Sequence, residues 1–111
     1  MMQIKTEQKE KALVLSLHGN LDADSVSAFK KTSYKLVEEG MRFLVIDCSE
    51  LGFIDSTGLG ALISLLRKLR MQNGDLKVAG LNNEVRSVFE ITRLHRLFDI
   101  LPNVQTACEK F

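Results

Sequence analysis

The chain has 111 residues, of which 45% are hydrophobic and 26% are charged, so it is long enough to form one compact domain with its own core. Its 15 Lys and Arg residues nearly balance its 14 Asp and Glu residues, giving a formal charge of +1. This balance leaves no basic surplus of the kind that nucleic-acid binding requires. The apolar content excludes a disordered chain, and no stretch approaches the roughly 18 consecutive apolar residues of a membrane span.

The cysteine and histidine content is low and carries no metal-binding pattern. Cys48 and Cys108 lie far apart, and His18 and His95 are isolated, so the number and spacing of ligands for zinc are missing. Two isolated cysteines favour free thiols in a reducing cytoplasm over a secreted disulfide framework. We therefore expect a cytoplasmic protein that carries no metal and no cofactor of its own.

The first half of the chain predicts a hairpin, a helix and a buried strand. Residues 2–18 alternate weakly and then become apolar, which is typical of a hairpin that ends in a turn at Gly19-Asn20. A helix with one apolar side follows, and Asp22 or Asp24 is the candidate N-cap. Residues 41–47 are continuously apolar, which indicates a strand covered on both faces.

The second half predicts further helices that alternate with strands. Residues 48–55 are expected to be a loop, and the leucines of 59–69 recur at helical spacing. A short strand over 76–80, a helix around 85–89 and a strand over 98–101 follow, before a terminal helix. Strands that alternate with helices in this way indicate an α/β fold.

The segment from Leu51 to Gly60 carries the most information about function, because it joins a buried strand to a strongly amphipathic helix. Ser56 is the expected N-cap of that helix. Gly58 and Gly60 each cost about 1 kcal/mol relative to Ala inside a helix, and they bare the backbone where another chain or a ligand can approach. The segment matches neither the phosphate-binding glycine loops nor the GxSxG element of esterases.

A phospho-acceptor receiver domain also fits the size and the alternating pattern, with Asp47 after a strand. A receiver needs an acidic pair at the end of its first strand and a Lys at the end of its last. Here Asp22 and Asp24 follow a Gly-Asn turn, and no Lys lies within 98–101. The receiver is therefore the weaker interpretation.

Taken together, several motifs resemble the STAS-domain anti-sigma factor antagonists of bacterial partner-switching systems. The resemblance implies one STAS domain over residues 1–111, with a mixed β-sheet of about four to five strands packed with about four α-helices. The matching motifs are Gly19-Asn20-Leu21-Asp22-Ala23, Leu44-Val45-Ile46-Asp47, Ile54-Asp55-Ser56-Thr57-Gly58-Leu59-Gly60, Phe89-Glu90-Ile91-Thr92-Arg93-Leu94 and Phe98-Asp99-Ile100.

What the resemblance implies is a regulatory switch and not an enzyme. In this family the serine that matches Ser56 is phosphorylated by the anti-sigma factor, a serine kinase that supplies the Mg-ATP. The unphosphorylated antagonist binds the kinase and releases its sigma factor. The phosphorylated antagonist no longer binds, and a serine phosphatase restores it.

The resemblance also implies a partner-binding surface around the acceptor. Ser56 is expected to be the phosphorylated residue, with Thr57 as the second candidate hydroxyl. Asp55 is expected to position the hydroxyl or to contact the kinase, and Gly58 and Gly60 to keep the docking surface flat. The full predicted surface is Asp22, Asp24, Asp55, Ser56, Thr57, Gly58, Leu59 and Gly60.

The alternative is a STAS module that binds a partner without being phosphorylated, for example in a stress-signalling or lipid-transport complex. The intact Asp-Ser-Thr-Gly-Leu-Gly segment favours the phosphorylated antagonist, because a pure scaffold has no need to keep the hydroxyl.

Overall fold

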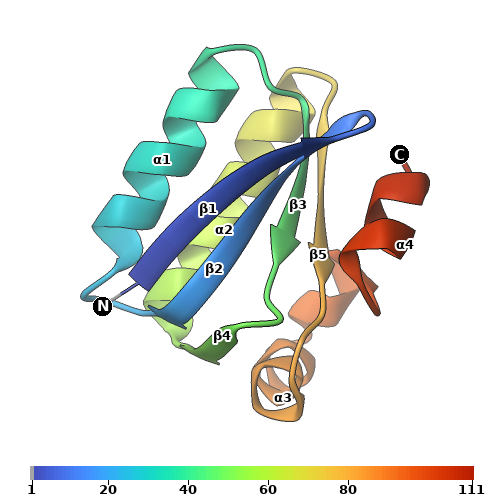
Figure 1. Cartoon of the computed structure of the whole chain (residues 1–111). Coiled ribbons are helices and arrows are strands. Elements are labelled where there is room, and N and C mark those ends of the chain that lie inside the picture. The colour runs from blue at the N-terminus through green and yellow to red at the C-terminus, as the bar shows by residue number, and fades with distance from the viewer. Residues whose placement is uncertain (1) are drawn as a thin grey trace.

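The computed structural model describes residues 2–111, so Met1, the first residue of the predicted domain, lies outside the described residues. Residues 2–111 form a β-sheet flanked by helices (Figure 1). In chain order the elements are β1 (Met2–Lys9), β2 (Ala12–Leu21), α1 (Val26–Glu38), β3 (Phe43–Asp47), β4 (Leu51–Ile54), α2 (Ser56–Met71), β5 (Asp75–Ala79), α3 (Asn83–Ile91), the 3-10 helix η1 (Leu94–Arg96), β6 (Asp99–Leu101) and α4 (Val104–Glu109).

The sheet is mixed, as predicted. Its main path is β1-β2-β3-β5-β6, and β4 pairs with β2 off this path. Among the strands of residues 2–111, only β1 and β2 pair antiparallel, and the other pairs are parallel. The α/β class and the four α-helices are confirmed, and β4 brings the sheet to 6 strands.

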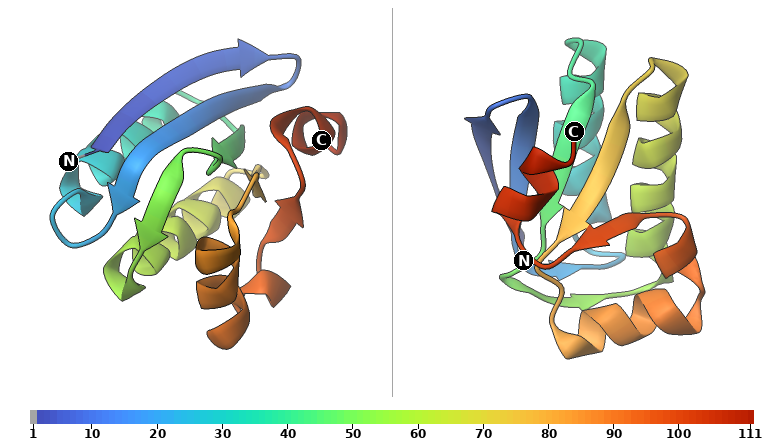
Figure 2. Two further views of the ribbon diagram at one scale, coloured as in Figure 1. Left: turned by 60° about the horizontal axis from the view of Figure 1, so that its bottom comes forward. Right: turned by 90° about the vertical axis from the view of Figure 1, so that its right-hand side faces the viewer.

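The two faces of the sheet are covered by different helices. Figures 1 and 2 show α1 and α2 on one face and the short α4 on the other. Side chains alternate between the faces, so Leu13 and Leu15 of β2 join the large core under α1 and α2, whereas Ala12 and Val14 pack with α4. Both faces of β3 are covered, which confirms the strand predicted within residues 41–47, although it begins at Phe43. Its first four residues are all apolar, as burial on both faces requires.

The prediction of a loop over residues 48–55 is wrong, because this segment contains β4. The predicted turn at Gly19-Asn20 is also wrong: β2 continues to Leu21 with a register shift between Gly19 and Asn20. Gly19 has a φ of 117°, a conformation that glycine adopts at little cost. β2 pairs with β3 through residues 13–16 and with β4 through residues 19–21, and the shift lies within the pairing with β4. The last residues of β2 thus hold β4 just before the start of α2.

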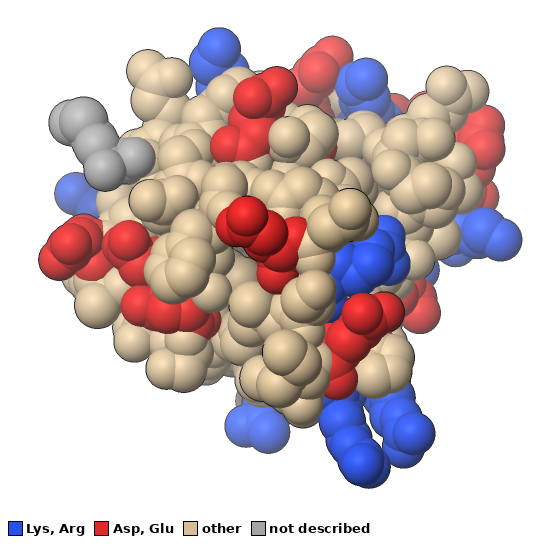
Figure 3. All heavy atoms as spheres, turned by 90° about the horizontal axis from the view of Figure 1, so that it is seen from below, with Lys and Arg blue, Asp and Glu red and all other residues tan. Residues whose placement is uncertain are grey.

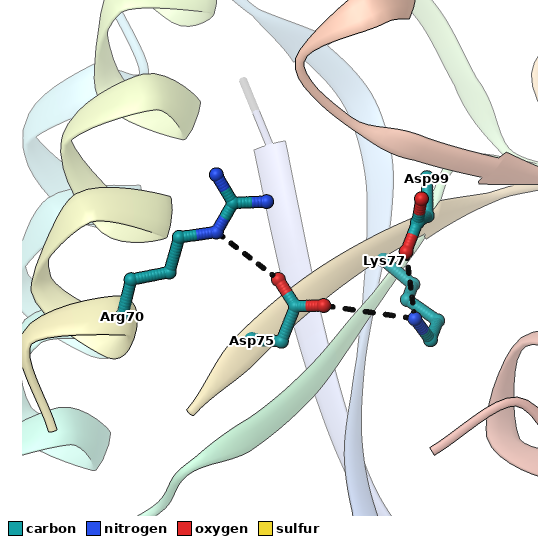
Figure 4. Close-up of polar contacts among 4 residues, drawn as sticks. All are labelled: Arg70, Asp75, Lys77 and Asp99. Carbon is teal, nitrogen blue, oxygen red and sulfur yellow. Dashed lines mark hydrogen bonds and ion pairs between the residues drawn. The ribbon is translucent and has the colours of Figure 1, made fainter. Parts of the chain in front are cut away.

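A network of ion pairs links α2, β5 and β6 (Figure 4). The Arg70 Nε and Lys77 Nζ atoms lie 3.5 and 3.6 Å from the two carboxylate oxygens of Asp75. The Lys77 ammonium group also donates to Asp99 Oδ2 at 2.8 Å, and it lies 4.6 Å from the centre of the Phe111 ring. The buried ammonium group of Lys77 thus has two carboxylate partners, which offset the cost of burying its charge.

The two cysteines are free and buried, as the sequence predicted. Burial, with a smaller contribution from the Asp47 charge, raises the pKa of the Cys48 thiol above its ordinary value of 9.0. Burial likewise raises the pKa of Cys108, with the nearby Glu10 carboxylate acting in the same direction.

These thiols predict a loss of stability at alkaline pH. A thiol whose pKa is higher in the folded state keeps its proton there, whereas the unfolded chain releases it above about pH 9. We expect the free energy of unfolding, measured with urea, to fall between pH 8 and pH 10. The fall should be smaller in a Cys48→Ala variant, and an unchanged fall in that variant would contradict the assignment.

Candidate functional site

The N-terminus of α2 presents the predicted acceptor to solvent. Ser56 is the first residue of this 16-residue helix and is exposed, as is Thr57. Within residues 2–111, the Ser56 hydroxyl makes no hydrogen bond to another protein group. The helix is held from below by its buried face, which comprises Gly58, Leu59, Ala61, Leu62, Leu65, Leu66 and Leu69. A free hydroxyl is thus carried on a rigidly packed helix end.

Asp55, and not Ser56, is the N-cap of α2, which corrects the prediction. Its backbone is extended, and its Oδ1 accepts a hydrogen bond from the Gly58 N–H at 2.9 Å. Its Oδ2 accepts a second hydrogen bond from the Ala23 N–H at 3.1 Å. A carboxylate accepts this capping hydrogen bond as a hydroxyl can, and its charge also interacts favourably with the positive end of the helix. With Asp55 capping the helix, Ser56 is released from a structural role.

The second hydrogen bond of Asp55 brings the β2–α1 loop to the site. In this loop Asp22 Oδ1 accepts from the backbone N–H groups of Asp24 and Ser25, at 3.0 and 3.2 Å. Neither aspartate caps α1, contrary to expectation, because Ser25 occupies the N-cap position. Asp22 instead folds the loop, and it leaves the Asp24 side chain exposed.

The two glycines of the site have different roles. Gly58 is buried, and a Cβ added there would meet the Leu21 carbonyl oxygen at 2.4 Å and two side-chain carbons at 2.9 Å. It therefore allows α2 to pack against β2, and it does not flatten a docking surface as predicted; its neighbour Leu59 is also buried. Gly60 is exposed and has open space around its Cα, which agrees with the predicted bare surface.

The residues of the predicted site therefore fall into two groups, one exposed to solvent and one buried beneath it. Asp24, Ser56, Thr57 and Gly60 are exposed, Asp22 and Asp55 are half-buried, and Gly58 and Leu59 lie inside. Figure 3 views this end of the molecule from below and shows acidic side chains spread across it, with most Lys and Arg side chains toward the edges. The residues exposed around Ser56 are small or acidic, and Asp24 and Asp55 give the site its negative charge.

Two neighbouring residues were missed by the sequence analysis. Phe53 of β4 is 48% exposed, although large apolar side chains are usually buried. Asn82 caps α3 by accepting from the Val85 N–H at 2.8 Å and also donates to the Leu51 carbonyl at 3.0 Å. Asn82 thereby fixes α3 beside β4. An Asn before a helical pattern is a recognisable capping signal, whereas nothing in the sequence distinguishes Phe53 from a core residue.

Asp55 should therefore be the main local support of the site. Removing its carboxylate in Asp55→Ala should lower the free energy of unfolding by about 1–2 kcal/mol, because two hydrogen bonds are lost. Asp55→Asn should cost less, since the amide oxygen can still accept from Gly58 while the bond from Ala23 is lost. Urea denaturation measures both values, and equal losses in the two variants would contradict the capping role.

No group of three or more His, Cys, Asp and Glu side chains in residues 2–111 has the arrangement of a metal site. Over the same residues, no helix combines the length and the apolar character needed to cross a bilayer.

Comparison with known proteins identifies the family of this chain. Residues 3–107 match the STAS domain, and the chain belongs to that family. It is 27% identical to the anti-sigma-B factor antagonist of Bacillus subtilis over 99 residues, which are 89% of this chain and 90% of the relative.

Solved structures of similar proteins share the fold. The crystal structure of an anti-sigma factor antagonist from Mycobacterium paratuberculosis superposes with a TM-score of 0.90 at 24% identity, covering 99% of this chain and 93% of the other. The Bacillus cell fate determinant SpoIIAA in its phosphorylated form gives a TM-score of 0.75 at 20% identity, covering 99% and 98% of the two chains. One of these fold relatives is thus a protein that is phosphorylated.

Proposed function

We propose that this chain is a cytoplasmic anti-sigma factor antagonist whose binding is controlled by phosphorylation of Ser56. The unphosphorylated protein binds an anti-sigma factor serine kinase and displaces its sigma factor. The kinase transfers phosphate from Mg-ATP to Ser56, the complex dissociates, and a serine phosphatase removes the phosphate. The observation that carries the proposal is an exposed, unengaged hydroxyl at the first residue of α2, next to a capping carboxylate.

The position of Ser56 suits a switch that acts through charge. Phosphorylation adds about −1.5 to −2 charge at pH 7, which shifts the formal charge of the chain from +1 to about −1. A helix N-terminus accommodates an anion, so the phosphorylated domain keeps its fold. The surface offered to the partner nevertheless becomes strongly negative and bulkier, beside Asp24 and Asp55. Binding is then lost by repulsion and steric blockage, and a large backbone rearrangement between the two forms would contradict this mechanism.

Phosphate mapping tests the site assignment. The protein is incubated with Mg-ATP and a candidate anti-sigma factor serine kinase, and the products are analysed by peptide mass spectrometry. We expect one phosphate on Ser56 and none on the exposed neighbour Thr57. A Ser56→Ala variant should remain unmodified while keeping the wild-type fold.

Two results would overturn the proposal. Phosphate found only at another residue would remove Ser56 as the acceptor. A wild-type protein that binds the anti-sigma factor but takes up no phosphate would instead indicate a STAS module that binds without modification.

A further inference from the structure

An apolar groove lies beside the predicted acceptor, between β4 and α3. Its volume is about 150 Å³. Hollows that hold a small-molecule ligand measure about 300–1,000 Å³, whereas a cavity of roughly 150 Å³ accommodates a single benzene-sized group. The groove is thus the right size for one side chain of another protein. Its lining residues are Gly52, Phe53, Ile54, Glu84, Val85 and Val88.

The groove is built before any partner binds. Phe53 contributes one wall from β4, and Val85 and Val88 contribute the other from α3. The Asn82 side chain joins the two elements, because it caps α3 and donates to the Leu51 carbonyl of β4. An anchoring pocket that is already formed binds without the cost of ordering a loop.

The groove lies close to the proposed phosphorylation site. The large hydrophobic side chains exposed among residues 2–111 are Phe53, Met71 and Ile91. Phe53 precedes Ser56 by three residues, so their Cα atoms are at most about 11 Å apart. Met71 ends the helix that Ser56 begins, so it lies about 22 Å away along the helix axis.

A partner that reaches Ser56 will also cover Phe53. A standard protein–protein interface buries about 800 Å² on each partner, which corresponds to a patch of about 16 Å radius. A patch of that size centred on Ser56 includes Phe53 and leaves Met71 outside. Aromatic side chains that are exposed near the centre of an interface are typical binding hot spots.

We infer that Phe53 and its groove are the apolar anchor for the kinase that phosphorylates Ser56, an inference that rests on the proposed function. The occupant is an apolar side chain of the kinase, inserted between Phe53 and Val88. Glu84 lies at the groove, so we expect one basic group of the kinase opposite Glu84 and away from Ser56. Charge complementarity of this kind favours encounter and orientation.

The anchor contributes equally before and after phosphate transfer, because it does not touch the reacting hydroxyl. An interaction of equal strength in the ground state and the transition state changes KM and leaves kcat unaltered. We therefore expect Phe53→Ala to raise the KM of the phosphorylation reaction about 10- to 30-fold, with kcat within about 2-fold of wild type.

Steady-state phosphorylation of the full chain by the kinase, together with the Kd of the complex, tests this inference. Met71→Ala is the matched control, because it removes an exposed apolar side chain outside the footprint, and both its KM and its Kd should stay within about 2-fold of wild type. Circular dichroism confirms the fold of each variant. Glu84→Gln provides a second variant on α3 and should raise KM in the same direction by a smaller factor.

The outcomes separate this inference from the proposed function. Wild-type kinetics and wild-type affinity in Phe53→Ala, with Ser56 still phosphorylated, would overturn the anchor and leave the proposed function intact. A fall in kcat at unchanged KM would also overturn it, because Phe53 would then act in phosphate transfer. Absence of phosphate on Ser56 of the wild-type protein would overturn both.

Discussion

Ser56→Asp is expected to weaken binding to the anti-sigma kinase by about 30-fold or more, because a like charge placed in an acidic interface costs several kcal/mol. Ser56→Ala is expected to bind as tightly as the unphosphorylated protein and to remain bound in Mg-ATP. The measurement is the Kd of each complex, determined by isothermal titration calorimetry.

A matched pair of variants separates charge from size in this experiment. Ser56→Asn has nearly the shape of Ser56→Asp but adds no charge, so it should lose much less affinity. Gln72→Glu adds the same single charge at the far end of α2 and should bind as the wild type does. Equal losses in Ser56→Asn and Ser56→Asp would refute the charge mechanism in favour of a purely steric one.

Gly58→Ala is expected to destabilise the fold by about 3 kcal/mol, because its Cβ would overlap the backbone of β2. The contact would be made with the Leu21 carbonyl oxygen, at 2.4 Å, and with the Leu21 and Ile54 side chains. Backbone cannot move aside as the end of a flexible side chain can. The start of α2 would therefore shift away from β2 and carry Ser56 with it.

Gly60→Ala is the control for this substitution, since no heavy atom lies within 4 Å of its added Cβ. Alanine favours the helix by about 0.5–1 kcal/mol over glycine, so this variant should be slightly more stable than the wild type. Urea denaturation measures both variants. Similar changes in the two would contradict the close-packing role of Gly58.

The elements that the sequence predicted well are those with a strong periodic pattern. The leucines of α2 recur at helical spacing, and the first four residues of β3 are all apolar, so both were located correctly. Gly40, a residue type that commonly ends helices, follows α1 with a φ of +96° and donates its N–H to the Val37 carbonyl. The spacing of apolar residues shows which faces of a helix or strand are buried, and it can be read from a single sequence.

The missed elements depend on contacts between distant segments. β4 has only 4 residues, and only Leu51 and Ile54 of these are buried, which gives no alternation. Its pairing depends on the register shift at Gly19, in another part of the chain. The second hydrogen bond of Asp55 depends in the same way on a distant group, the Ala23 N–H, 32 residues away.

A motif therefore identified the candidate acceptor, whereas the contacts around it are evident only from the three-dimensional structure. The sequence placed Ser56 at a helix start, but it could not show that Asp55 caps the helix and frees the hydroxyl. Nor could it show that Gly58 is required for packing while Gly60 is free. The exposure of Phe53 depends on how β4 and α3 meet, and no local pattern encodes that arrangement.

The most direct test of this account compares the unmodified protein with the same protein phosphorylated on Ser56. Both forms are titrated against the anti-sigma kinase, and circular dichroism verifies that both are folded. We predict that the phosphorylated form binds about 100-fold more weakly, equivalent to about 2.7 kcal/mol, with an unchanged spectrum. Equal affinities of the two folded forms would contradict the central claim that phosphate on Ser56 controls binding.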